Sequence, residues 1–83
     1  MMLRESPPEY EESARVRYTR HARIRMEQRK ITQEEVLQTI DSPDVSYADK
    51  AGNPIYVGHL GGRRIKVVVG KDTSPPVIIT VGD

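Results

Sequence analysis

The segment Tyr18 to Thr32, YTRHARIRMEQRKIT, decides how the first half of this 83-residue chain folds. It overlaps a stretch of alternating polar and apolar side chains, residues 15–19, which predicts a short, half-buried strand. Thr19 is a favourable N-cap residue, so we expect a helix to begin directly after it. On that helix Ala22 and Met26 lie four residues apart, and they form a narrow apolar stripe that would face the core.

The same helix would carry His21, Arg25 and Arg29 in one row, because residues four apart are neighbours on a helix surface. An imidazole can exchange a proton near neutral pH, and guanidinium groups bind phosphate or carboxylate oxygens. In one reading His21 is a general acid or base and the two arginines bind a phosphodiester. In the other reading the arginines pair with carboxylates of the acidic segments, and His21 fills a gap beside the core.

A second helix follows closely. Thr32 and Glu35 have the spacing of a capping box, and Ile31 can pack onto Val36 as a hydrophobic staple. We expect this helix to end at Ser42, because the residue before a proline is disfavoured in the helical region. The two short helices would form a helical corner.

The rest of the chain predicts strands. We expect strands over residues 55–60, 63–70 and 77–81, and a short extended piece over 45–48. Gly61-Gly62 predicts a tight hairpin between the first two of these strands. The resulting α+β domain would have the order β-α-α-β-β-β, with two short helices packed on one face of a three- to four-stranded antiparallel sheet.

The length allows one domain. Residues 1–13 contain four glutamates and two prolines, so we expect a flexible acidic tail there and a single domain over 14–83. The chain has no cysteine, which fits a reducing compartment. No apolar stretch approaches the ~20 residues that span a bilayer, and the N-terminus has no apolar centre of a signal peptide. We therefore expect a cytoplasmic protein without membrane association.

The net charge of +1 conceals an uneven distribution. Residues 13–31 hold seven basic side chains and one glutamate, a net charge of +6, whereas residues 32–53 hold one lysine and five acidic side chains, a net charge of −4. A basic segment of this density attracts nucleic acid or an acidic partner. It can equally be a solvated helix face that the acidic segments balance.

Three strand residues add to the candidate site. Arg64 and Lys66 would share one face of their strand, and a lysine between apolar neighbours is partly desolvated, which makes its proton more available. Thr80 is the lone hydroxyl of the last strand, where it either binds a phosphate or is an ordinary strand threonine. His59 reads as a surface residue. Two histidines with scattered acids and no cysteine do not indicate a metal site. No Gly-rich loop opens a helix, so the pattern does not indicate a nucleotide cofactor either.

The run YTRHARIRMEQRKIT, together with the EEV and SPD that follow it, resembles the small prokaryotic domain-of-unknown-function family 4258. The strand at Tyr56-Val57-Gly58 and the segments RRIKVVV and VIITV extend the resemblance over roughly residues 15–82. That family is similar to RelE/ParE-like toxins and to BrnT ribonuclease toxins, which share a two-helix, antiparallel-sheet fold. The resemblance implies a ribonuclease that needs no metal ion and uses the RNA 2′-hydroxyl as nucleophile.

The resemblance makes His21 and Arg25 the motif residues of the first helix, and it places Lys66 and Thr80 on strands that carry functional residues in the broader fold. Our first hypothesis is a toxin-like, metal-independent endoribonuclease acting on RNA phosphodiesters, without a cofactor and with an antitoxin-like partner. Its assigned residues are His21, Arg25 and Lys66 for catalysis and Arg29, Arg64 and Thr80 for phosphate binding. The second hypothesis is a non-catalytic module that binds protein or nucleic acid, or that forms a homodimer.

Overall fold

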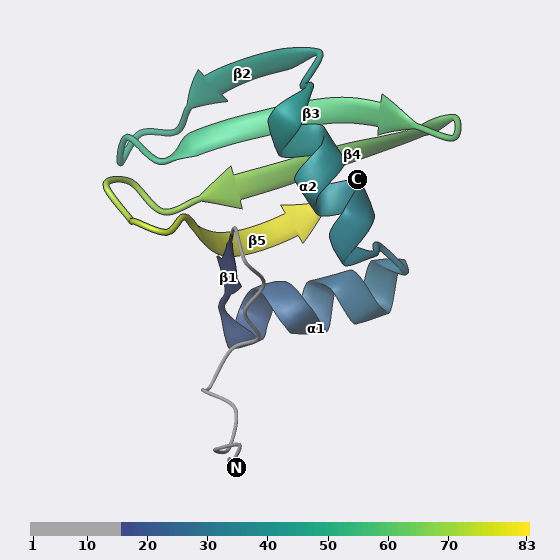
Figure 1. Ribbon diagram of the computed structural model, residues 1–83, viewed down its shortest axis with the longest axis horizontal. Coiled ribbons are helices and arrows are strands. Elements are labelled where there is room, and N and C mark those ends of the chain that lie inside the picture. Colours follow the sequence, from purple (N-terminus) through teal and green to yellow (C-terminus); the bar gives the residue numbers. More distant parts are fainter. Residues whose placement is uncertain (1–15) are drawn as a thin grey trace, which may run out of the picture.

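A five-stranded sheet forms the body of the protein (Figure 1), in a computed structural model that describes residues 16–83. The elements in chain order are β1 (Arg17–Tyr18), α1 (Arg20–Arg29), α2 (Gln33–Asp41), β2 (Val45–Ala48), β3 (Pro54–Leu60), β4 (Arg63–Val69) and β5 (Val77–Gly82). The predicted α+β class with two helices is confirmed. The predicted acidic tail, residues 1–13, lies outside the described residues.

The sheet differs from the expectation in two details. Its order is β1-β5-β4-β3-β2, so the extended piece at Val45–Ala48 is a full fifth strand. The sheet is mixed, because β1 pairs in parallel with β5 while all other neighbours are antiparallel. Hairpin turns fix the direction of neighbouring strands, whereas β1 and β5 are joined through the whole domain, and sequence patterns carry no signal for that pairing.

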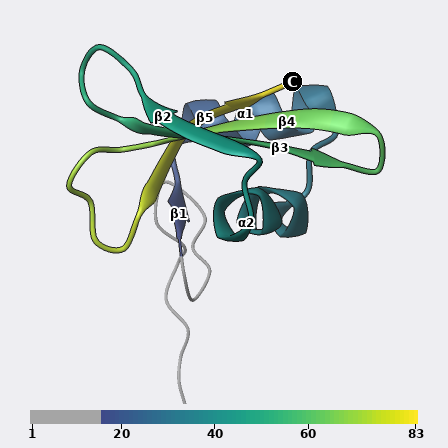
Figure 2. The same cartoon turned by 90° about the horizontal axis from the view of Figure 1, so that it is seen from above.

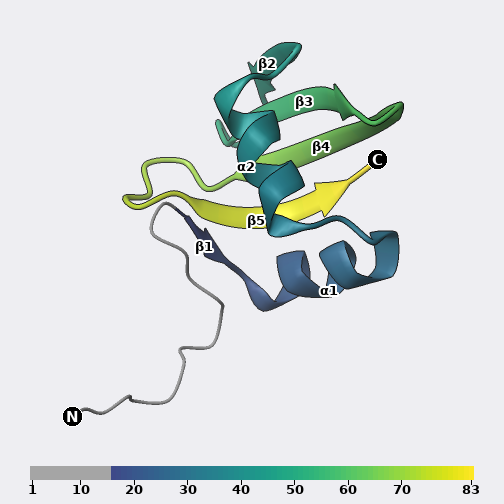
Figure 3. The same cartoon turned by 45° about the vertical axis from the view of Figure 1, so that its right-hand side comes forward.

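The two helices take different positions, so the expectation that both cover one sheet face is wrong. Helix α2 packs over β3 and β4, whereas α1 lies along β5 (Figure 3). Seen from above, α2 stands off one side of the sheet and α1 lies in line with it (Figure 2). The reason is that β1 pairs only with Val77 and Ile78, which leaves the rest of the β5 edge free for α1.

One hydrophobic cluster joins both helices to the sheet. Its buried members are Val16, Tyr18, Ala22, Met26, Ile31, Val36, Ile65, Val67, Val69, Ile78 and Val81. Ala22 and Met26 are the buried residues of α1, as the apolar stripe predicted. Alternate residues of β4 belong to this cluster, which defines the sheet face toward α2. We call it the covered face.

Both predicted helix starts are confirmed. The Thr19 hydroxyl accepts a hydrogen bond from the Ala22 amide at 3.0 Å and donates one to the Ile79 carbonyl at 2.9 Å, so the N-cap also ties α1 to β5. Thr32 and Glu35 form the capping box in both directions. These caps depend on residues three apart in the chain, which is why the sequence predicts them well.

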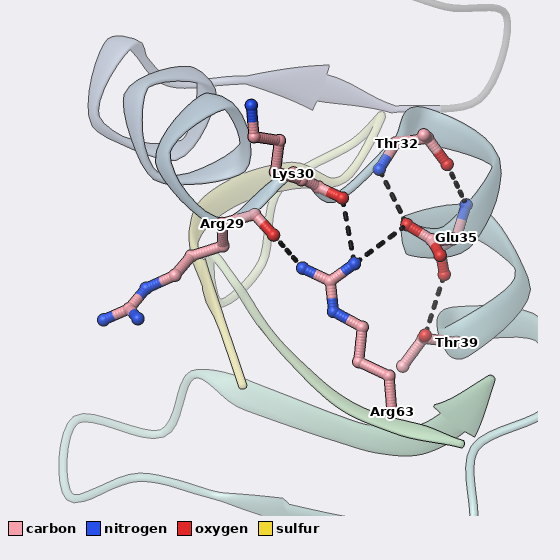
Figure 4. A network of polar contacts seen from close by, with 6 residues as sticks. All are labelled: Arg29, Lys30, Thr32, Glu35, Thr39 and Arg63. Atoms are coloured by element: carbon pink, nitrogen blue, oxygen red, sulfur yellow. Dashed lines mark hydrogen bonds and ion pairs between the residues drawn. The ribbon is translucent and has the colours of Figure 1, made fainter. Parts of the chain in front are cut away.

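The corner between the helices is held by Arg63, at the start of β4 (Figure 4). Its guanidinium donates to the carbonyls of Arg29 and Lys30, where α1 ends, and lies 4.0 Å from the Glu35 carboxylate. A cation there satisfies carbonyls that have no partner within the helix and complements the helix dipole. Arg63 thereby links the β3–β4 hairpin to both helices.

Candidate functional site

The sheet face opposite α2 carries most of the charged strand residues. We call it the open face, and its residues are Ile55, Val57, His59, Arg64, Lys66, Val68 and Thr80. The strand register places them together, because Lys66 lies opposite Val57 and Gly82, and Arg64 lies opposite His59. Ile55, Val57 and Val68 form a second, smaller apolar cluster on this face.

A cavity of about 170 Å³ opens where this face meets α1. It is lined by Arg25, Lys66, Val68, Thr80, Val81, Gly82 and Asp83. Three of the six predicted site residues, Arg25, Lys66 and Thr80, therefore meet at one place although they come from α1, β4 and β5. A water molecule occupies about 30 Å³, so the cavity has room for a group of phosphate size with a few waters.

Arg25 reaches across the free edge of β5. Its Nε donates to the Val81 carbonyl at 3.3 Å. Its Nη2 lies close to Gly82, so that a Cβ atom at this position would be in van der Waals contact with it, at 3.5 Å. Helix α1 lies along the part of the β5 edge that β1 leaves open. The Val81 carbonyl at that edge therefore accepts a hydrogen bond from Nε of Arg25. The terminal nitrogens then lie over the end of β5, beside the cavity.

Lys66 and Thr80 form the floor of the cavity, and both are half-buried. Lys66 lies opposite Gly82, which has no side chain to fill the space between the lysine and Arg25. Thr80 reaches the open face because the β4–β5 register shifts by one residue between Val68 and Val69. Such a bulge redirects side chains, and the sequence pattern does not reveal it.

Arg29 and Arg64 gather around Asp83, at the rim of the cavity. Arg29 Nη1 lies 3.8 Å from the Asp83 carboxylate, and Arg64 Nη1 donates to the Asp83 backbone carbonyl at 3.4 Å. Arg29 thus contacts a carboxylate, but that of Asp83, which follows β5, and not one of the acidic segments that the second reading named. Sequence reasoning missed Asp83.

His21 is exposed on the first turn of α1 and does not line the cavity. The row that it begins does run along β5, since Arg25 lies at Val81 and Arg29 at Asp83. Four helical residues advance about 6 Å, close to the advance of two strand residues. The same step back from Arg25 would place His21 beside Ile79, away from the residues that line the cavity.

The second histidine has a defined partner that the sequence did not suggest. His59 Nδ1 lies 2.6 Å from Asp44 Oδ2, and both side chains are more than half exposed. The two residues are 15 positions apart, and Asp44 precedes β2 whereas His59 belongs to β3. Only the β2–β3 pairing brings them together.

Within residues 16–83, no three histidine, cysteine, aspartate or glutamate side chains gather into a potential metal site. Neither α1 nor α2 has the length and apolar character of a bilayer-spanning helix.

Comparison with known proteins gives one family. The model of a family described as "Domain of unknown function (DUF4258)" matches residues 18–83, from the end of β1 through β5. Comparisons with curated proteins and with solved structures give no match. The similarity to RelE/ParE-like and BrnT-like toxins therefore stays a prediction.

Proposed function

The chain belongs to the DUF4258 family, whose description states no function, and we propose that it is a metal-independent endoribonuclease whose open-face cavity binds an RNA phosphodiester. One observation carries the proposal. Arg25, Lys66 and Thr80 line the same cavity, and they supply two cations and a hydroxyl around a space of phosphate size. No other function class proposed from the sequence uses these three side chains together.

The chemistry of phosphate binding fits each of the three groups. Arg25 is anchored through Nε, so its terminal nitrogens are the ones available to two phosphate oxygens. Lys66 is half-buried, and the lower effective dielectric strengthens its attraction for an anion. The Thr80 hydroxyl can donate a third hydrogen bond. The Asp83 carboxylate at the rim would repel an anion. Arg29 and Arg64 both contact Asp83, and their positive charges offset this repulsion.

In the proposed reaction the ribose 2′-oxygen attacks the adjacent phosphorus and the 5′-oxygen leaves. Negative charge builds up on the phosphorus oxygens, where Arg25 and Lys66 stabilise it more strongly than in the bound substrate. The sequence motif assigns proton transfer to His21. Because the lining of the cavity does not include His21, the phosphate-binding part and the proton-transfer part of the proposal need separate tests.

The test of the phosphate-binding part is cleavage of a fluorescent mixed-sequence RNA in EDTA by the wild type, Arg25→Gln and Lys66→Gln. We expect the wild type to give products with 2′,3′-cyclic phosphate ends, and each variant to lose about 10²–10³-fold in kcat. Lys50→Gln, in the exposed turn before β3, is the matched control and should cleave like the wild type. Absence of cleavage by the wild type, or equal cleavage by all four proteins, would contradict the proposal.

A second candidate function, a protein-binding module in the form of a homodimer, is favoured by β2. All four of its residues are exposed, including Val45 and Tyr47 at 55% and 49%, and β2 is an edge strand. If the β2 strands of two protomers pair antiparallel about Ser46, each Val45 lies opposite Tyr47 of the other protomer, which gives two such pairs. Sedimentation equilibrium tests it: a dimer that Tyr47→Lys dissociates supports this candidate, and a monomeric wild type excludes it.

A further inference from the structure

Among residues 16–83, His59 and Asp44 form a histidine–carboxylate contact, with Nδ1 2.6 Å from Oδ2. An ionised carboxylate accepts the proton of Nδ1, which leaves the lone pair of the neutral ring on Nε2. The ring is more than half exposed, so Nε2 is accessible to a ligand on the open face. A base that a carboxylate orients in this way is the arrangement that general-base catalysis uses.

The pair lies on the same sheet face as the cavity. His59 is directly opposite Arg64, and Arg64 is two residues from Lys66 on β4. His59 and Lys66 are thus diagonal neighbours on adjacent antiparallel strands, with Cα atoms about 7–8 Å apart. A phosphodiester held by Lys66 and Arg64 at the β4 side of the cavity can therefore have its 2′-hydroxyl directed toward His59.

We propose that His59, oriented by Asp44, is the general base of RNA cleavage on the open face, an inference that rests on the proposed function. His59 Nε2 takes the proton of the 2′-hydroxyl while the bond from the 2′-oxygen to phosphorus forms. The bond from phosphorus to the 5′-oxygen breaks, and a water molecule protonates that leaving oxygen. The proton on His59 then neutralises the hydroxide, so the products are a 2′,3′-cyclic phosphate and a 5′-hydroxyl.

This assignment differs from the one that the sequence motif suggests. The chain has two histidines, and both are exposed on described elements. His21 is on the first turn of α1, which lies along β5. His59 lies on the open face, and its Nδ1 contacts the Asp44 carboxylate. The charged groups that face His59 are Asp44 on its own side of the sheet and Arg64 and Lys66 from β4.

The experiment compares the two histidines as matched variants. His59→Gly and His21→Gly are assayed for RNA cleavage, and for binding of the same RNA with 2′-deoxy sugars, which cannot be cleaved. We expect His59→Gly to lose about 10²–10⁴-fold in kcat with unchanged binding, a larger loss than His21→Gly shows, and Lys50→Gln to cleave like the wild type. Added imidazole should restore part of the activity of His59→Gly, because it replaces the lost base and a purely structural role would not respond.

Asp44 is tested as a positioning residue. Asp44→Asn should lower kcat about tenfold or more while KM stays unchanged, since it orients the base without touching RNA. Asp44→Glu should recover part of that loss. A fall in binding with either Asp44 variant would contradict the positioning role.

The outcomes separate this inference from the function on which it rests. If the wild type neither binds nor cleaves RNA, the proposed function fails and the inference falls with it. If the wild type cleaves and His59→Gly cleaves equally well, the inference alone fails. Loss of cleavage in His21→Gly with none in His59→Gly, or loss of RNA binding in His59→Gly, would also overturn it.

Discussion

Arg63 and Arg64 are adjacent on β4, but their guanidinium groups serve opposite faces of the sheet. Arg63, on the covered face, contacts the end of α1 and the capping box of α2. Arg64, on the open face, donates at 3.4 Å to the carbonyl of Asp83 and is otherwise exposed. Two neighbouring cations of one strand therefore have different roles. One closes the fold, and the other is available to a ligand.

The same contrast holds for the two faces as a whole. On the covered face, Ile65, Val67 and Val69 belong to the core that includes the helices. The start of α2, which packs on this face, is capped by Thr32 and Glu35. The open face places Lys66, Arg64 and His59 beside a small apolar cluster, where the fold does not require their charges. Substitutions at neighbouring positions that belong to different faces test this difference.

The largest effect is expected from the pair Ile65→Ala and Lys66→Ala. Ile65 is fully buried on the covered face, so its truncation should lower the free energy of unfolding by about 2–5 kcal/mol. Lys66 is the next residue but lies on the open face, and its truncation should change stability by about 0.5 kcal/mol or less. Urea denaturation followed by circular dichroism measures both, and equal losses would remove the distinction between the faces.

The next effect concerns the two arginines. Arg63→Gln should lower the free energy of unfolding by about 1–3 kcal/mol, because the hydrogen bonds to the helix-end carbonyls and the ion pair with Glu35 are lost together. Arg64→Gln should leave stability within about 0.5 kcal/mol and weaken RNA binding instead. Thermal unfolding and a fluorescence-anisotropy titration of both proteins check this, and the reverse pattern would show that the faces were assigned wrongly.

A smaller effect is expected in the salt dependence of RNA binding. Each phosphate contact of a single strand contributes about 0.7 to the slope of log Kd against log salt concentration. Lys66→Gln should reduce the slope by about that amount, whereas Lys50→Gln should leave it unchanged. Titrations at four salt concentrations measure the slopes. An unchanged slope for Lys66→Gln would mean that its ammonium group does not contact phosphate.

The smallest effect is expected from Asp49, in the turn between β2 and β3. Hydrogen bonds from the backbone amide and then the side-chain amide of Asn53, with a further one from Ala51, hold its pKa below the ordinary 3.8. A lowered pKa in the folded state stabilises the protein above the unfolded-state pKa, and this contribution is lost as pH falls through the folded value.

Asp49→Asn should therefore lower the melting temperature slightly at pH 7, and the difference from wild type should shrink below about pH 4. Melting curves between pH 7 and pH 3 measure it. A difference that grows at acid pH would contradict the sign of the effect. The open-face site should bind RNA equally well in both proteins at pH 7.

Local interactions explain how much could be predicted from the sequence. The N-cap Thr19, the capping box of Thr32 and Glu35, and the stripe of Ala22 and Met26 all depend on residues at most four apart. Propensity and spacing are sufficient for such features. The predicted strands at 55–60, 63–70 and 77–81 are likewise observed, with small differences at their ends.

Contacts between distant residues explain the rest. Arg63 meets Lys30 across 33 positions, and Arg25 meets Val81 across 56, so neither contact has a sequence signal. The parallel β1–β5 pairing and the position of α1 depend on the same distant packing. For the candidate site, helical spacing suggested Arg25, and the strand residues together with the family resemblance suggested Lys66 and Thr80. The partnership of Asp44 with His59 required the strand register.

We propose that the open face, and not the covered face, is the surface that binds RNA phosphate. An amide ¹H–¹⁵N NMR titration of the labelled protein with a short 2′-deoxy-substituted oligonucleotide tests it most directly. We expect shift changes concentrated at Arg25, Lys66, Thr80 and Gly82, with α2 unaffected. Shift changes confined to α2, or none at saturating oligonucleotide, would contradict it.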